Sequence, residues 1–144
     1  MAELDQANDL FLKKKFDDAI RKYAQILEAD PENLIALNNM GYTLSKLKKF
    51  DEALECYDKS LEIEPNDRIV LVNKISLFRK IGKTSDAIEV CDKLLEKNPD
   101  ELIVLYHKLR LLKKINMFEE SNKICNKILS IYPSNIEVRN ELIK

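Results

Sequence analysis

The heptapeptide LEIEPND, residues 61–67, decides how the chain folds, because it ends one helix and prepares the next. Its first half consists of good helix formers. Pro65 lacks a backbone donor and disfavours helical geometry in the residue before it, so the helix must stop there. Asn66 and Asp67 then offer side chains of the kind that cap the start of a new helix. The heptapeptide therefore predicts a junction between two helices.

This junction occurs four times in the chain, as LEADPEN at 27–33, LEIEPND at 61–67, LEKNPDE at 95–101 and LSIYPSN at 129–135. Successive prolines are 34 residues apart, and a fixed period of this length indicates a stacked repeat architecture. A leucine column and a small-residue column share the period: Leu27, Leu61, Leu95 and Leu129, and Ala19, Ala53, Ala87 and Ser121.

The sequence of each repeat predicts two helices. In the second repeat, apolar residues at helical spacing predict a first helix over 33–47 and a second helix over roughly 50–63. The turn between paired helices favours a residue in the left-handed conformation, expected at Gly82 and Asn116, and at Lys14 and Lys48 with a small strain cost. Residues 136–144 repeat the start of a first helix and are expected to cover the last pair. The stretch SNIE, residues 134–137, predicts a capping box at the start of this terminal helix.

The composition predicts one folded domain. Of 144 residues, 34% are charged and 45% hydrophobic, while two glycines and four prolines leave little turn chemistry for an all-β fold. The acidic start is unlike a signal peptide, and the apolar runs are too short to cross a bilayer. Three widely spaced cysteines imply no disulfide framework, and Cys91 and Cys125 are expected to be packing residues. These features predict a cytoplasmic protein with no membrane segment.

The net charge of −1 is unevenly distributed along the chain. Residues 1–67 hold nine Lys/Arg and fifteen Asp/Glu, a net charge of −6, whereas residues 68–144 hold fifteen and ten, a net charge of +5. One interpretation is variation between surface faces. The other is a basic second half that favours acidic partners.

The second repeat contains Leu37-x2-Met40-Gly41-x2-Leu44, then Ala53-x3-Tyr57, then Pro65. This resembles the tetratricopeptide repeat, whose 34-residue pattern is W-x2-L-G-x2-Y, A-x3-F and P. The resemblance covers 1–135 and implies an all-α, right-handed α-solenoid of stacked antiparallel helix pairs. It implies a single domain over 1–144, with repeats at 1–33, 34–67, 68–101 and 102–135 and a capping helix at 136–144.

The third and fourth repeats depart from this pattern. The small position held by Ala7 and Gly41 becomes Ile75 and Leu109. Bulk at this position is expected to push the helices apart or to tilt them, so that the second half curves differently.

No sequence motif for catalysis is present. The chain lacks HExxH, CxxC, GxSxG and a Gly-rich phosphate loop, and its single histidine, His107, has no cysteine or acid at metal-ligand spacing. His107 is better explained as a surface residue than as a base. Basic residues are mixed with acids, which disfavours nucleic-acid binding. We therefore expect no enzyme, no metal, no cofactor and no nucleic-acid partner.

The resemblance implies that first helices line a concave groove that binds an extended peptide. Isoleucines form one predicted groove column, and asparagines, which can bond a peptide backbone through both amide groups, lie beside them. The alternative is that the isoleucines pack against neighbouring helices and the asparagines are merely tolerated. The predicted groove residues are Asn8, Ile35, Asn38, Asn39, Tyr42, Ile69, Asn73, Arg79, Ile103, Tyr106, His107, Arg110, Lys113 and Lys114.

The resemblance also allows a comparison with the clamp by which some modules of this family hold chaperone tails. Its positions fall on Leu4, Asn8, Asn39, Ile69 and Asn73, so the asparagines match but all three cations are missing. We therefore expect weak or no binding of a tail carboxylate, and expect an internal segment with apolar and acidic side chains instead. The predicted function is an adaptor or scaffold that binds a protein or peptide. The alternatives are a self-associating module that forms a salt-sensitive, weak homodimer, and a co-chaperone-like module with an incomplete clamp.

Overall fold

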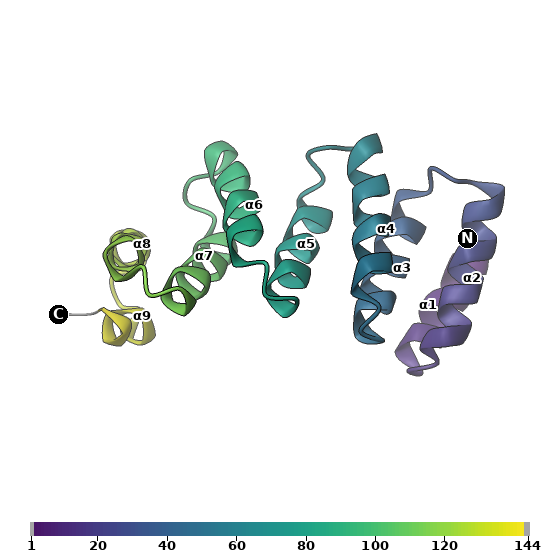
Figure 1. Cartoon of the computed structure of the whole chain (residues 1–144), viewed down its shortest axis with the longest axis horizontal. Helices are drawn as coiled ribbons and strands as arrows, with labels where there is room; N and C mark the ends of the chain where they lie inside the picture. The colour runs from purple at the N-terminus through teal and green to yellow at the C-terminus, as the bar shows by residue number, and fades with distance from the viewer. Residues whose placement is uncertain (1, 143–144) are drawn as a thin grey trace. The chain divides into compact units, whose positions relative to one another are not determined.

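The computed structural model describes residues 2–142, and the regular structure in that range is helical. Figure 1 shows the nine helices of these described residues in chain order: α1 (Ala2–Leu12), α2 (Phe16–Ala29), α3 (Leu34–Lys46), α4 (Phe50–Ile63), α5 (Arg68–Lys80), α6 (Thr84–Lys97), α7 (Leu102–Lys114), α8 (Phe118–Ile131) and α9 (Ile136–Glu141). The helices predicted over 33–47 and 50–63 are α3 and α4, with bounds within one residue of the prediction.

The chain divides into two compact units, with the boundary between Leu77 and Phe78 inside α5. We call the part up to Leu77 unit 1 and the part from Phe78 unit 2. In each repeat, the helix that precedes the internal turn is the first helix (α1, α3, α5 and α7) and the one that follows it is the second helix. The assignment of 1–144 to a single domain stays a prediction.

The prolines end the second helices as predicted. The residue before each proline leaves the helical conformation, as at Asp30 with φ −138° and ψ 86°, while its N–H still bonds the carbonyl of Ile26 at 2.9 Å. A side-chain cap then begins α3, α5 and α9, whereas the N-cap of α7, Glu101, makes no side-chain capping bond. Asn33 Oδ1 accepts from the backbone N of Ala36 at 3.0 Å, and Asp67 Oδ1 accepts from the N of Ile69 at 3.0 Å.

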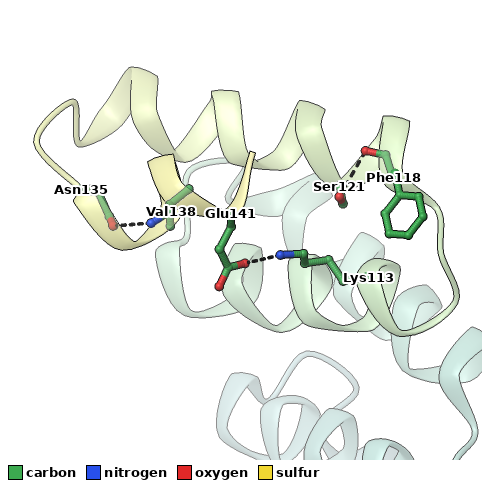
Figure 2. A network of polar contacts seen from close by, with 6 residues as sticks. All are labelled: Lys113, Phe118, Ser121, Asn135, Val138 and Glu141. Atoms are coloured by element: carbon green, nitrogen blue, oxygen red, sulfur yellow. Dashed lines mark hydrogen bonds and ion pairs between the residues drawn. The ribbon is translucent and has the colours of Figure 1, made fainter. Parts of the chain in front are cut away.

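The predicted capping box that begins at Ser134 is wrong by one residue. Helix α9 starts at Ile136, so its N-cap is Asn135, whose Oδ1 accepts from the N of Val138 at 3.0 Å (Figure 2). Asparagine is as good an N-cap as serine, and its position directly before the helix decides the choice. Of the predicted capping segment, Ile143 and Lys144 lie outside the described residues.

The turn inside each helix pair has the predicted left-handed residue. Lys14, Lys48 and Asn116 have φ values of 59°, 60° and 60°, and Gly82 has 77°. The N–H after the left-handed residue reaches back across the helix end, as from Lys49 to the carbonyl of Leu44 at 2.9 Å. This is the Schellman arrangement, which satisfies carbonyls that the helix leaves unpaired.

Each of three buried clusters joins a helix pair to the helix that follows it. In unit 1, one cluster contains Ala7, Ala19, Tyr23, Ile26 and Ala36, and a second contains Leu44, Ala53, Cys56, Tyr57, Val70 and Leu77. In unit 2, a third contains Leu105, Leu109, Cys125, Ile128 and Val138. The apolar faces are thus covered by near neighbours in the chain, as a stacked repeat requires.

The small residues predicted to bring helices together do so in unit 1. A Cβ atom built on Gly41 would lie 2.7 Å from Cε1 of Tyr57, closer than real Cβ contacts come. The corresponding bulky residues of the later repeats, Ile75 and Leu109, are themselves buried. Their predicted effect on curvature stays a prediction.

The three cysteines are buried and free, which confirms the packing role predicted for Cys91 and Cys125. Burial raises the pKa of the Cys91 thiol to about 12, so this thiol is a poor nucleophile at neutral pH. Within residues 2–142, no helix combines the length and the apolar character needed to cross a membrane.

Candidate functional site

The predicted groove residues fall into two sets, one in each unit. Unit 1 holds Asn8, Ile35, Asn38, Asn39, Tyr42, Ile69 and Asn73, and unit 2 holds Arg79, Ile103, Tyr106, His107, Arg110, Lys113 and Lys114. All of them lie on the first helices α1, α3, α5 and α7. Each set is described within its own unit.

Asparagine side chains tie the first helices of unit 1 together. Asn8 Oδ1 accepts two hydrogen bonds, one from the hydroxyl of Tyr23 at 2.6 Å and one from Nδ2 of Asn39 at 3.1 Å. Asn73 Nδ2 donates to Oδ1 of Asn38 at 2.9 Å. A side-chain amide has two donors and two acceptor sites, so these bonds use only part of each one. The asparagines therefore have a structural role and keep capacity for a ligand.

A pocket of 210 Å³ lies beside the first of these amide pairs, lined by Asn8, Phe11, Leu12, Tyr23, Asn39 and Tyr42. We call it the amide–aromatic pocket. The rings of Phe11 and Tyr42 face it with centroids 5.7 Å apart, and Nζ of Lys46 lies 5.1 Å from the centroid of the Tyr42 ring. Leu12 is 77% exposed at its edge. Such a pocket can receive an apolar side chain while its amides bond a main chain.

The three isoleucines of the predicted column face solvent. Ile35, Ile69 and Ile103 are 56%, 62% and 53% exposed. These values contradict the alternative that neighbouring helices bury them. Ile103 also lines a pocket, whereas the other two lie outside the amide–aromatic pocket.

A second pocket, of 320 Å³, lies in unit 2 and is lined by Ile103, Tyr106, His107, Arg110 and Glu137. We call it the basic pocket. Nη1 of Arg79, at the end of α5, lies 3.4 Å from Nδ1 of His107. Because a guanidinium only donates, Nδ1 accepts this contact and the neutral imidazole carries its proton on Nε2. Burial, then Arg79 and Arg110, lower the pKa of His107 below its usual value of 6.5.

The predicted lysines at the end of α7 have different environments. Nζ of Lys113 pairs with Oε2 of Glu141 at 2.9 Å and thereby ties α7 to α9 (Figure 2). Lys113 therefore contacts the terminal helix and does not line the basic pocket. Lys114 is exposed and does not line the basic pocket.

Four residues that line the pockets were absent from the predicted set. Phe11 and Leu12 line the amide–aromatic pocket from the end of α1. They follow Asn8 by three and four residues, which places all three on the same face of the helix. Tyr23 reaches it from the second helix α2, and only its place in the family pattern signals its presence. Glu137 joins the basic pocket from α9, and no sequence signal indicated it. Within residues 2–142, no three His, Cys, Asp or Glu side chains gather as a metal ion would need.

The stacked helix pairs and their regular junctions define the class of protein, a helical repeat protein. The family model for the tetratricopeptide repeat matches residues 35–67, and a search of curated proteins found no match. Residues 35–67 thus match a tetratricopeptide repeat in sequence, and the described residues, with four helix pairs and a terminal helix, have the fold of tetratricopeptide-repeat proteins. Repeats of this family mediate protein–protein interactions.

Solved structures of this fold resemble the chain closely in geometry and weakly in sequence. A tetratricopeptide repeat protein from Parabacteroides merdae ATCC 43184 has a TM-score of 0.88 at 23% identity, with 96% of this chain and 55% of that chain covered. The MamA protein, as residues 41 to the end from Desulfovibrio magneticus RS-1, has a TM-score of 0.84 at 18% identity, covering 98% and 80%. YrrB, described as having an unusual peptide-binding site, has 0.77 at 16% identity, covering 96% and 71%. This chain therefore spans little more than half the length of the Parabacteroides protein.

Proposed function

We propose that the chain is a protein-binding module, an adaptor or scaffold, that holds extended segments of partner proteins on its first helices. The observation that carries this proposal is the amide–aromatic pocket. There, Phe11 and Tyr42 offer ring faces beside the amides of Asn8 and Asn39. An extended segment presents side chains and main-chain amides at regular intervals, which suits such a pairing of apolar and amide surface. The peptide-binding site named for YrrB, which has the same fold, supports it.

Partner segments should carry apolar or acidic side chains according to the unit that binds them. Apolar side chains suit the amide–aromatic pocket of unit 1, whereas in unit 2 acidic ones suit Arg79 and Arg110 and apolar ones the exposed Ile103. The proposal assigns the chain no catalysis, since His107 contacts a guanidinium where a catalytic imidazole would have a carboxylate to orient it. The buried, free cysteines support a reducing, cytoplasmic environment.

The test is binding of short fluorescent peptides that carry one Leu or Phe in an otherwise polar, extended sequence, measured by anisotropy. We expect binding to be lost when the anchor is changed to Ser, and to weaken about tenfold or more in the Tyr42→Ser variant, since pocket anchors dominate such contacts. Tyr132→Ser removes a tyrosine that is 48% exposed in unit 2 and is the matched control. Equal binding of the Leu and Ser peptides would overturn the proposal.

The uneven charge of the two halves favours one other candidate, self-association through opposite charges. The mass in solution at low and at high salt decides between the two. A dimer at low salt that dissociates at high salt would support self-association, because salt screens exposed charges. A monomer at both would exclude it.

A further inference from the structure

The cations of unit 2 differ in whether they have an anionic partner. Lys108 pairs with Asp92 at 2.6 Å, Lys113 with Glu141 at 2.9 Å and Lys127 with Asp100 at 3.8 Å. Arg79 and Arg110, in contrast, form no ion pair with a carboxylate of residues 2–142, although both act on His107. Two guanidiniums beside one imidazole, with no carboxylate bound to them, repel one another. Such an arrangement is suited to an anion from outside the chain.

The donors around the basic pocket come from two helices. Arg79 approaches from the end of α5, and Arg110, which is exposed, stands one turn along α7 from His107. Because Arg79 occupies Nδ1, the Nε2–H of His107 remains available as a donor. Tyr106 lines the same pocket, and its hydroxyl oxygen accepts a hydrogen bond from Nδ2 of Asn135. The hydroxyl proton of Tyr106 is therefore also available.

We propose that the basic pocket binds a phosphoryl group carried on a Ser or Thr side chain of a partner segment, with Arg79, Arg110 and His107 as its ligands. A phosphoryl group carries about −1.5 to −2 charges at pH 7 and three strong acceptor oxygens. A carboxylate has one charge and two oxygens, which a single guanidinium satisfies in a bidentate pair. The guanidinium of Arg110, an imidazole N–H and a phenol line the pocket of 320 Å³, and the Arg79 guanidinium contacts the same imidazole, so the donors match the larger anion.

The charged groups around His107 determine how its pKa changes when an anion binds. Arg79 of α5 and Arg110 of its own helix disfavour the imidazolium, and Glu137 of α9 lines the same pocket. From α6, Asp92 pairs with Lys108, and from α9, Glu141 pairs with Lys113. A bound dianion neutralises the two guanidiniums and favours the imidazolium. Anion binding should therefore raise the pKa of His107, and affinity should increase as the pH falls through that raised value.

This inference deepens the proposed function, since it gives the chemistry of a group on the partner segment, and it depends on that function only for the peptide carrier. The basic pocket lies wholly in unit 2, and the anchor test of the previous subsection uses unit 1. A negative result in one test therefore does not affect the interpretation of the other.

The experiment uses the full chain, and its single histidine makes the imidazole C2–H signal directly assignable by proton NMR. The pKa of His107 is measured with and without sodium sulfate, which does not titrate in this range and replaces phosphate as a probe. We expect the pKa to rise on adding sulfate. In Arg110→Gln without sulfate, the pKa of His107 should be higher than in the wild type, because Arg110 no longer lowers it. The rise in this pKa on adding sulfate should be smaller. An unchanged pKa at saturating sulfate would overturn the proposal.

Three peptides of one sequence then identify the source of the anion, with phosphoserine, Glu or Ser at the central position, beside inorganic phosphate. We expect the phosphoserine peptide to bind at least about tenfold more tightly than the Glu peptide, because two charge-assisted contacts are added. Equal affinity of the Glu peptide would overturn the phosphoryl assignment. Binding of inorganic phosphate as tight as that of the phosphopeptide would overturn the assignment to a partner's side chain.

Matched variants separate the pocket from general charge. Arg79→Gln and Arg110→Gln should each weaken the phosphopeptide about tenfold, since each removes a charge-assisted hydrogen bond. Glu137→Gln should strengthen it, because it removes the carboxylate that lines the pocket. Lys123→Gln removes the same charge from an exposed position on α8. It should change the affinity by less than about twofold, because salt screens an exposed charge outside the pocket. A loss in Lys123→Gln equal to that in Arg110→Gln would show a diffuse charge effect and overturn the site.

Discussion

Lys48 holds its backbone at φ 60°, a region in which a side chain with a Cβ atom is strained, and the turn it forms would accept glycine. We expect Lys48→Gly to stabilise the protein by about 0.5–1 kcal/mol, because the relief of strain exceeds the entropy cost of glycine. Urea unfolding measures the change. The matched control is Lys59→Gly inside α4, where the backbone is helical and the same substitution should cost about 1 kcal/mol. Destabilisation by Lys48→Gly would contradict the strain argument.

Ser60 is completely buried in α4, and its Oγ has no hydrogen-bond partner among the residues that the structure describes. A buried hydroxyl without a partner loses its hydrogen bonds to water and gains none in the folded protein. Ser60→Ala should therefore stabilise the folded protein by about 0.5–1.5 kcal/mol. The control is Ser121→Ala, since the Ser121 hydroxyl donates to the carbonyl of Phe118 at 3.2 Å (Figure 2). The urea midpoint should rise for Ser60→Ala and rise less, or fall, for Ser121→Ala. The opposite order would contradict this account.

The backbone role of single residues could be predicted from the sequence, but the partners of side chains could not. The left-handed positions follow from repeat spacing and turn chemistry, which are local. The contacts of the candidate site join residues 31, 35 and 28 positions apart, namely Asn8 with Asn39, Asn38 with Asn73, and Arg79 with His107. None of these separations is the repeat length, because neighbouring first helices meet along diagonals and not at equivalent positions. Residue columns in the sequence therefore could not predict which side chains pair.

At the scale of elements, the approach of α3 to α4 depends on the missing side chain of Gly41. A Cβ there would meet the Tyr57 ring at 2.7 Å, so we expect Gly41→Ala to cost about 1–3 kcal/mol through overpacking, despite the better helix propensity of alanine. Thermal unfolding measures it. Adding Tyr57→Leu should make the cost of Gly41→Ala disappear, as residues in contact are not additive. Full additivity of the two changes would show that the ring is not the obstacle.

Helix α9 covers the apolar face of the last pair. Val138 is 1% exposed within a cluster with Leu105, Leu109, Cys125 and Ile128, and the partly buried Leu142 packs against the same cluster. Removing the residues after Pro133 should lower the melting temperature and promote aggregation, because this face becomes exposed. The control, Glu141→Gln, breaks only the pair with Lys113 and should change stability by less than about 1 kcal/mol. An unchanged melting temperature of the truncated chain would mean that α9 is dispensable.

For the whole molecule, we propose that both units belong to a single domain of four repeats, with stability that varies along it. The first two repeats have the small residues Ala7, Ala19, Gly41 and Ala53 at their helix contacts. In the third and fourth repeats, the position of Ala7 and Gly41 is occupied by the bulky Ile75 and Leu109. We expect amides of 16–63 to be better protected than those of 102–144 in hydrogen exchange, since repeat proteins open in units. The reverse ranking would contradict this view of the packing. The exchange of backbone amides, resolved by residue, provides the measurement.

The side-chain caps at Asn33 and Asp67 have a consequence for how the chain can be shortened. Both residues stand directly before a first helix, and both accept a backbone N–H of that helix. Excision of residues 34–67 would place Asn33 immediately before Arg68, so that the incoming helix receives a cap of the same kind in the same phase. Excision of one residue more or fewer would change the phase between this cap and the apolar face of α5 by about 100°. A whole repeat is thus the unit whose removal keeps both the cap and the buried face of the next helix in register.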